Sequence, residues 1–297
     1  MVNVIWVLEN IRKSKNFYKP FDTKLLLTSV SQWKKHNPNT NTILYCDKLT
    51  YDTFSEIEII KAWDEAKVVP QSEGIDKNVF WASSKVEVLR GVTKPTIILD
   101  NDFVVYKSFE SFLKNKVIVG HDENGQDYYP DALDPYVRQT SHLLSRPNHK
   151  SVNCCFLYFP NPKFASAYAN TSVELMKELT KLKAPNSNYL VYAEQLLLKH
   201  LLDLHKQEYD TLVNEIWQCK ERYFIETNKG LIDRKEQKLW FRHYWMDKPK
   251  IVNNESGFSL EKETKQLDNS VKNHIFHKKD YVVNLENISK RIDGYFR

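Results

Sequence analysis

The first half of the chain alternates short apolar, β-branched runs with segments whose apolar residues recur at helical spacing. The expected strands are Val2–Leu8, Thr42–Cys46, Lys67–Val69 and Thr96–Leu99, and the expected helices are Leu25–Trp33 and Val79–Leu89. Such alternation builds parallel β-α-β units. The sequence therefore predicts an α/β fold with a central, mostly parallel sheet flanked by helices, whose ligands bind beyond the carboxyl ends of the strands.

The pattern is weaker after about residue 115, where the loops lengthen. Here the expected strands are Val117–Val119 and Asn153–Phe159, and the expected helices are Lys163–Lys181 and Tyr189–Leu204. A chain of 297 residues with 41% hydrophobic content can fill one large core, or a core with a small addition. We expect residues 251–297 to form a helical or irregular C-terminal appendage.

The location in the cell is predicted from the apolar runs and the cysteines. The apolar runs are too short to cross a bilayer, and Val2–Leu8 lacks a basic leader, so we interpret it as a first strand in a cytoplasmic protein. The four cysteines are expected to be reduced thiols, with the adjacent Cys154 and Cys155 on opposite faces of a strand and Cys46 and Cys219 standing alone. A net charge of +5 is too small for a nucleic-acid-binding tail, but it suits a nucleotide or a polyanionic acceptor.

The segment with the clearest chemistry is Pro95–Asp102, in which an apolar strand ends in Asp100, Asn101 and Asp102. If the chain stays extended, both carboxylates point to the same face. Paired carboxylates at the ligand edge of a sheet need a cation or a basic partner, and Mg²⁺ or Mn²⁺ prefers oxygen ligands. A polar turn without a metal is the alternative, because Asp and Asn are common turn residues.

This segment resembles the DxD motif of GT-A glycosyltransferases, and the likeness continues in order along the chain. It is closest to the retaining family that includes glycogenin and bacterial galactosyltransferases. The matching segments are Val2–Leu8, Trp81–Lys85, Leu99–Asp102, Ser151–Phe159, Glu194-Gln195 and His243–Pro249. The chain departs from the family in having Glu194 in place of an Asp, two cysteines after Asn153, and no glycine between His243 and Lys248.

The resemblance implies a GT-A (Rossmann-like) domain over residues 1–250, with a nucleotide-binding half (1–115) and an acceptor-binding half (116–250). It implies a metal-dependent transfer of sugar from a nucleotide sugar, by default a UDP-sugar, to an acceptor hydroxyl with retention of configuration. The acceptor could be a glycan, a protein or a modified base of DNA.

The resemblance also implies roles for single residues. Mn²⁺ or Mg²⁺ would be held by Asp100, Asp102 and His243. Donor-binding residues would be Lys85, Asn101 and Lys248, and residues at the reaction centre would be Lys85, Asn153 and Gln195. Two of these roles have structural alternatives: His243 could belong to an aromatic cluster with Trp240, Phe241, Tyr244 and Trp245, and Lys85 could be a solvated helix residue.

The loop Gly120–Glu123 follows a strand that we expect to neighbour the one ending at Asp100. Asp122 could then be a general base or bind acceptor hydroxyls, although a polar loop is an equal alternative. Tyr128, Tyr129 and Pro130 could stack on a sugar or simply pack. We expect an acceptor cleft lined by Asp122, Glu123, Asn153, Glu194 and Gln195, although Glu194 could also face solvent.

Two other classes of function fit parts of the sequence. The segment Asp100–Val104 matches the motif of haloacid-dehalogenase-like phosphatases, with Asp100 as nucleophile and Asp102 as acid/base, but that motif belongs on the first strand of its fold. A non-catalytic module that binds sugar nucleotides or glycans is the other alternative.

Overall fold

The computed structural model describes residues 1–9, 19–124, 129–144, 150–212, 224–227, 230–233, 241–244, 247–272, 274–277 and 282–295. Tyr128, Cys219, Trp240 and Trp245, which the sequence analysis names, lie outside these ranges. None of the helices within them is long and apolar enough to cross a membrane.

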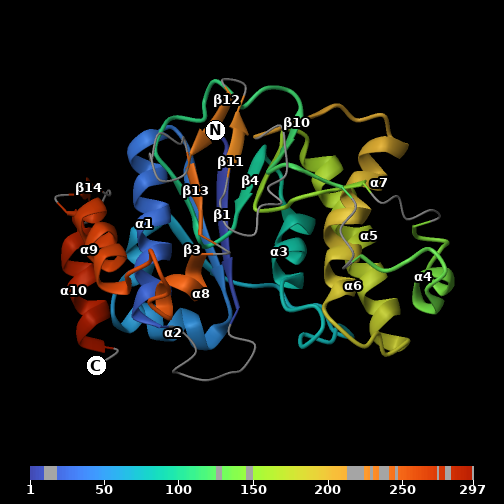
Figure 1. Ribbon diagram of the computed structural model, residues 1–297, viewed down its shortest axis with the longest axis horizontal. Helices are drawn as coiled ribbons and strands as arrows, with labels where there is room; N and C mark the ends of the chain where they lie inside the picture. Colours follow the sequence, from blue (N-terminus) through green and yellow to red (C-terminus); the bar gives the residue numbers. More distant parts are fainter. Residues whose placement is uncertain are drawn as a thin grey trace.

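A seven-stranded sheet forms the centre of the molecule (Figure 1). In spatial order its strands are β10 (Tyr209–Thr211), β6 (Val117–Val119), β9 (Phe156–Phe159), β4 (Thr96–Leu99), β1 (Asn3–Leu8), β2 (Asn41–Cys46) and β3 (Glu65–Val68). All of them run in one direction except β9, which is antiparallel to both β4 and β6. The predicted α/β class with a mostly parallel central sheet is therefore confirmed.

Helices cover both faces of this sheet, as Figure 1 shows. On one side lie α1 (Pro20–His36), α2 (Lys48–Glu56), α8 (Asp247–Val252), α9 (Leu260–Val271) and α10 (Leu285–Tyr295). On the other side lie α3 (Ser83–Glu87), α4 (Pro135–Gln139), α5 (Pro162–Lys181), α6 (Asn188–Val191) and α7 (Leu197–Leu204). The 3₁₀ turns Ile59–Ala62 and Val88–Gly91 complete the helical elements, together with a π-helical turn, Tyr192–Leu196, between α6 and α7.

In the described part of the chain, four pairs of short strands lie outside the central sheet. They are β5 (Phe103–Val105) with β13 (Phe241–His243), β7 (Asp122–Asn124) with β8 (Lys150–Val152), β11 (Phe224–Thr227) with β12 (Gly230–Asp233), and β14 (Ile275–His277) with β15 (Val282–Asn284). The first two pairs matter for the site, because each extends from the end of a central strand.

Among the residues that the structure describes, the two larger of three apolar clusters fill most of the space between the sheet and its helices. Cys154 packs in one cluster and Cys155 in the other, so the two thiols face opposite sides of the sheet, as the sequence predicts. Cys46, Cys154 and Cys155 are buried free thiols, and burial raises the pKa of Cys46 to about 12.

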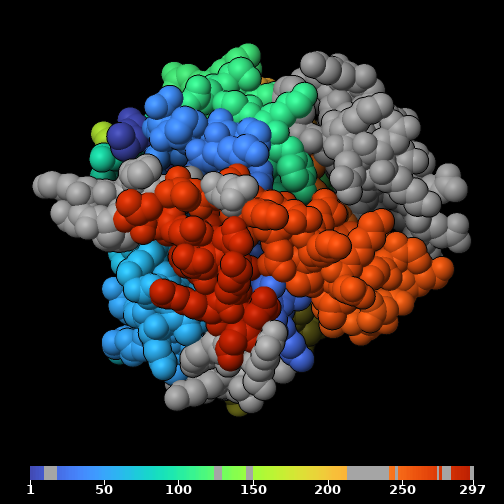
Figure 2. Space-filling model, turned by 90° about the vertical axis from the view of Figure 1, so that its left-hand side faces the viewer, coloured from blue at the N-terminus to red at the C-terminus, as the bar shows by residue number. Residues whose placement is uncertain are grey.

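Residues 251–297 were expected to form an appendage, and their described part packs tightly on α1. Lys24 of α1 forms ion pairs of 2.9 Å with Asp268 of α9 and Asp293 of α10. Ile288 and Ile292 join the same apolar cluster as Trp33. Figure 2, which faces this side, shows C-terminal residues across the middle of the surface.

Three local expectations were wrong. The expected helix Val79–Leu89 is a helix only from Ser83 to Glu87 and continues as a 3₁₀ turn, because the chain before it coils in separate turns, with Phe80 N–H bonded to Asp76. The expected strand from Asn153 to Phe159 begins at Phe156, since the Asn153 side chain accepts the Cys155 N–H and takes it out of the sheet. The strand before Gly120 does not neighbour β4, because β9 lies between them.

Candidate active site

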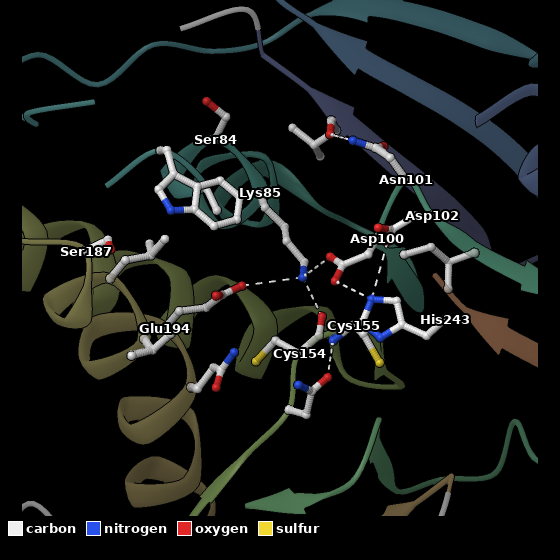
Figure 3. Close-up of a pocket in the computed structure, with 18 of the residues that line it drawn as sticks. Ser84, Lys85, Asp100, Asn101, Asp102, Cys154, Cys155, Ser187, Glu194 and His243 are labelled. Atoms are coloured by element: carbon white, nitrogen blue, oxygen red, sulfur yellow. Dashed lines mark hydrogen bonds and ion pairs between the residues drawn. The ribbon is translucent and has the colours of Figure 1, made fainter. Parts of the chain in front are cut away.

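The two acids of the sequence motif stand at the carboxyl end of β4, whose four residues are all buried. The Asp100 N–H donates to Cys155 O at 2.9 Å, which fixes the strand end against the chain entering β9. The chain turns at this point and does not stay extended, because Phe103 N–H donates to Asp100 O at 3.1 Å. Both carboxylates nevertheless reach the same partner, the imidazole of His243 (Figure 3).

His243 comes from β13, which pairs with β5 directly after the motif, with His243 opposite Phe103. Its Nε2 lies 3.5 Å from Asp100 Oδ2 and 3.3 Å from Asp102 Oδ1. Its ring centre is also 6.1 Å from that of Phe103, which stacks on Phe241 at 4.6 Å. His243 therefore sits at the edge of an aromatic cluster and contacts both acids, so the two sequence interpretations describe one location.

Two lysines pair with the carboxylate oxygens of Asp100 and Asp102 that His243 does not contact. Lys85 Nζ lies 2.7 Å from Asp100 Oδ1 and 3.5 Å from Glu194 Oε1, and it also donates to Cys154 O. Lys248 Nζ lies 3.2 Å from Asp102 Oδ2 and 3.6 Å from Asp22 Oδ1. We call the set Lys85, Asp100, Asp102, His243 and Lys248 the carboxylate wall.

These neighbours control the proton affinities in the carboxylate wall. Burial alone would raise the pKa of Asp100, but Lys85 and His243 lower it below its usual range. Burial would lower the pKa of Lys85, and the charges of Asp100 and Glu194 raise it instead. For Glu194 burial dominates, and its pKa is raised in spite of Lys85. The wall thus holds ionised acids at the sheet edge, which is what a cation site requires.

The donor set of the carboxylate wall fits a divalent cation. Ligand atoms of Asp100, Asp102 and His243 all lie within 4.8 Å of one another. Neighbouring ligands of an octahedral ion with bonds of roughly 2.1 Å are about 3.0 Å apart, close to the 3.3 and 3.5 Å that separate His243 from the two carboxylates. The two carboxylates are ligands that suit Mn²⁺ or Mg²⁺. These three residues could therefore hold such an ion after small movements.

A second wall is built from hydrogen-bonded neutral groups around one buried acid, Glu123. Asn153 Nδ2 donates to Glu123 Oε1 at 2.9 Å, and Tyr129 OH lies 2.6 Å from Glu123 Oε2. The same hydroxyl lies 2.7 Å from Gln195 Oε1. We call Glu123, Tyr129, Asn153 and Gln195 the amide wall.

The π-helical turn Tyr192–Leu196 explains how Glu194 and Gln195 both reach the site. A π turn widens a helix and leaves carbonyls without their usual partners, and such turns are frequent at functional sites. Here α5 supplies the donors, since Ser172 Oγ donates to Ala193 O at 2.6 Å and Tyr168 OH to Glu194 O at 3.1 Å. Glu194 is buried and paired with Lys85, so the expectation that it could face solvent was wrong.

The carboxylate wall, together with Glu123, Asn153 and Gln195 of the amide wall, lines one pocket of about 550 Å³. The predicted site residues that line it are Lys85, Asp100, Asn101, Asp102, Glu123, Asn153, Glu194, Gln195, His243 and Lys248. Asp122 is not among them, because its carboxylate turns to the other face of β7 and accepts from Tyr209 OH at 2.8 Å. Tyr129 packs against the apolar cluster and contributes its hydroxyl to the amide wall.

Several residues at the pocket have no role predicted from the sequence. Trp81 lines it while 54% exposed, and Glu9 lines it with its carboxylate bound to Lys77. Asp22, the second partner of Lys248, helps to line an adjoining hollow of about 300 Å³ beside Asp102. An acid in the first turn of a helix, as at Asp22, and a tryptophan four residues before Lys85 are weak signals that sequence alone does not separate from packing.

The family of the chain follows from a sequence comparison. The family model described as "Family of unknown function (DUF6734)" matches residues 29–250, a span that contains every member of both walls. The chain belongs to this family. A search of curated proteins found no match for this DUF6734 member.

Solved structures give weaker likenesses. The glycosyltransferase GlyE of Streptococcus pneumoniae TIGR4 matches with 14% identity and a TM-score of 0.38 over 71% of this chain and 46% of that chain, and its apo form matches similarly over 70% and 44%. The galactosyltransferase LgtC, solved with donor and acceptor sugar analogues, matches with 9% identity and a TM-score of 0.41 over 65% and 70%. This chain thus spans less than half the length of the GlyE chains. Scores of this size are too low to assign an activity.

Proposed function

We propose that this chain is a metal-dependent glycosyltransferase that moves a sugar from a nucleoside diphosphate sugar to an acceptor hydroxyl. The observation that carries the proposal is the cluster of Asp100, Asp102 and His243 at the ligand edge of the sheet, with ligand atoms within 4.8 Å of one another. The cluster opens into a pocket that is also lined by Glu123, Asn153 and Gln195 of the amide wall. A charged end and a hydroxyl-binding end are what a nucleotide sugar needs.

In this proposal the carboxylate wall binds the diphosphate. Asp100, Asp102 and His243 would hold Mn²⁺ or Mg²⁺, which neutralises the charge of the bound diphosphate. Lys248, about a third exposed, can reach phosphate oxygens while Asp22 keeps it near Asp102. Lys85 carries a buried positive charge beside Asp100, so it stabilises the negative charge that grows on the departing diphosphate.

The amide wall would take the sugar and the acceptor. Asn153 and Gln195 carry no charge and bond to hydroxyls through amide groups. UDP is the donor nucleotide, transfer retains configuration, and the acceptor is a glycan, a protein or a modified base of DNA. These choices rest on the resemblance of the motifs. Residues 1–115 bind the nucleotide and residues 116–250 the acceptor.

The position of the acids disfavours the phosphatase alternative. Asp100 follows β4, the fourth strand of the central sheet in chain order, whereas the phosphatase motif belongs on a first strand.

The first test is a thermal-shift panel of nucleotide sugars, each with and without Mn²⁺. A ligand that binds the native state raises the melting temperature, so at least one nucleotide sugar should do so only when Mn²⁺ is present. Hydrolysis of that nucleotide sugar without acceptor then separates a transferase from a binding module. A panel in which Mn²⁺ changes no melting temperature contradicts the proposal.

A further inference from the structure

Trp81 differs from the other tryptophans that the structure describes. Trp6, Trp33 and Trp63 are fully buried in the core, whereas Trp81 is 54% exposed. It precedes α3 and lines the pocket of the candidate site. Single apolar side chains are common on protein surfaces and need no explanation. A large aromatic ring that is exposed inside a binding pocket is instead available to a ligand.

A second side of the pocket is formed by one helical face. α6, the π-helical turn and α7 follow one another without a break. Asn188, Val191 and Gln195 line the pocket, and their spacing of three and four residues places them on one face of this segment. Ser187, which is exposed, lines the pocket just before them. This face therefore extends from the solvent to Gln195 of the amide wall.

The segment that carries Trp81 also leads from the solvent to the interior. Trp81 is exposed, whereas the side chain of Lys85, four residues later, is 12% exposed. Lys85 pairs with Asp100 and Glu194 deep in the site. Figure 3 shows Ser187 and Asp100 on opposite sides of the Lys85 side chain. A molecule that enters from the solvent therefore meets Trp81 and Ser187 before it reaches the carboxylate wall.

The chemistry of this outer part of the pocket suits a sugar ring. We define the outer part as Trp81, Ser187, Asn188 and Val191, none of which carries a charge. A pyranose has apolar C–H groups on its faces and hydroxyls around its edge, so an indole face matches the first, and hydroxyl and amide groups match the second. A nucleic-acid acceptor would bring phosphates, for which these four residues supply no positive charge.

We infer that Trp81 stacks on a pyranose ring of a carbohydrate acceptor, with Ser187 and Asn188 bonding to hydroxyls at the edge of that ring. This role rests on the proposed function and deepens it, because it selects a glycan from the classes of acceptor. The carboxylate wall binds the donor diphosphate, and Trp81 determines which acceptors fit beside it.

Three variants separate the aromatic face from exposure in general. Trp81→Ala removes the indole, and Trp81→Phe keeps a smaller aromatic ring. Leu204→Ala is the matched control, because Leu204 is 62% exposed at the end of α7 and is not among the described residues that line this pocket. Both positions are more than half exposed, so all three variants should fold as the wild type does, which circular dichroism and thermal melting check.

Contact with the indole is measured by ¹⁹F NMR of protein labelled with 5-fluorotryptophan, with Trp81→Phe identifying the Trp81 signal. The probes are the methyl glycosides of glucose and galactose, maltose and lactose, each titrated with UDP and Mn²⁺ present. At least one of these sugars should shift the Trp81 signal in a saturable manner. The inference is overturned if none does. A shift caused by a DNA duplex and by no sugar would indicate a nucleic-acid acceptor, and would also overturn it.

The energetic role of the ring is measured by calorimetry with the sugar that shifts the signal. Trp81→Ala should weaken its binding roughly tenfold and Trp81→Phe about threefold, since part of the aromatic contact remains in the second variant. Leu204→Ala should bind as the wild type does. Equal affinity in Trp81→Ala and Leu204→Ala overturns the inference.

Failure of the proposed function is distinguishable from failure of this inference. If the wild type does not bind UDP with Mn²⁺, the proposed function fails. The same sugar titrations without UDP then decide whether Trp81 binds a sugar ring: a saturable shift that Trp81→Ala weakens supports the stacking role, and no shift overturns it.

Discussion

The two walls of the pocket are built on different physics. The carboxylate wall is a set of alternating charges, in which Lys85, His243 and Lys248 each lie 2.7 to 3.5 Å from Asp100 or Asp102. The amide wall holds one charge, that of Glu123, among neutral groups with directional bonds. Coulomb energy changes slowly with distance, whereas a hydrogen bond weakens steeply when its angle changes. Ligand binding at the carboxylate wall should therefore change most when a charge is removed. Ligand binding at the amide wall should change most when the shape or the hydrogen-bond pattern is altered.

The largest effect is expected from a charge change in the carboxylate wall. Asp102→Asn should keep the fold and weaken Mn²⁺-dependent binding of UDP by roughly a hundredfold or more, because it removes an anionic metal ligand. Loss of a residue that only hydrogen-bonds to a metal ligand already weakens metal binding by about ten- to hundredfold. Calorimetry with and without Mn²⁺ measures this. Asp203→Asn is the control, because Asp203 is half exposed and pairs with Lys199 on α7. Unchanged affinity in Asp102→Asn would remove the metal assignment.

Lys85→Ala should reduce kcat by roughly a hundredfold, with a smaller change in KM, because its charge is needed most as the diphosphate departs. It should also lower the free energy of unfolding by about 2 kcal/mol, because the buried Glu194 loses the lysine with which it pairs. The expected loss is moderate, because Asp100, the other partner of Lys85, is a third exposed to solvent. Steady-state kinetics and urea unfolding check both. The control is Lys116→Ala, whose lysine pairs with Glu208 and Asp210 away from the pocket. Equal kcat with an altered KM would mean that Lys85 only binds the donor.

His243→Ala should have a smaller effect, because the oxygen ligands of Asp100, Asp102 and the diphosphate remain. We expect Mn²⁺ to bind roughly tenfold to a hundredfold more weakly. Competition with a metal-binding dye measures the affinity, with His142→Ala as a control for an exposed histidine. A loss as large as that of Asp102→Asn would show that the imidazole contributes as much to metal binding as that carboxylate, and would contradict this ranking.

Gly120→Ala tests the amide wall through shape. A Cβ at Gly120 would lie 2.7 Å from Cys155 Sγ and 3.1 Å from Asn153 Oδ1, so the Cys155 side chain must shift and Asn153 must give by a few tenths of an ångström. The variant should lose about 1–2 kcal/mol of stability and some turnover, while Mn²⁺-dependent UDP binding stays constant. Gly91→Ala is the control, since nothing lies within 4 Å of its Cβ. Weaker UDP binding in Gly120→Ala would show that the two walls are not independent.

The sequence was most informative where one local signal determines the structure. The run Thr96–Leu99 is fully apolar and ends in acids, and β4 has these bounds. The predicted helix Leu25–Trp33 lies inside α1, which extends to Pro20 and His36 because Pro is favoured at a helix start and Asn37 closes the end. The motif resemblance also predicted that Lys85, Asp102 and His243 share one site with Asp100. In the structure Lys85 and His243 both contact Asp100, and His243 also contacts Asp102.

The rest depends on contacts that one sequence does not display. The antiparallel strand β9 enters between β4 and β6, and its apolar residues fit either direction. Asp122 and Glu123 are adjacent on β7, and only the pairing with β8 decides which of them faces the pocket. The burial of Glu194 depends on a π turn whose carbonyls are satisfied by α5, a long-range arrangement without a local signature.

The central claim is that Asp100, Asp102 and His243 together hold a divalent cation beside a diphosphate. The direct measurement is a crystal structure of the wild type grown with Mn²⁺ and UDP, with anomalous diffraction data collected at an energy where manganese scatters. The account predicts one strong anomalous peak in bonding contact with carboxylate oxygens of Asp100 and Asp102 and with His243 Nε2, and with UDP phosphate oxygens on its open side. Bound UDP with no manganese peak among these three residues would contradict it.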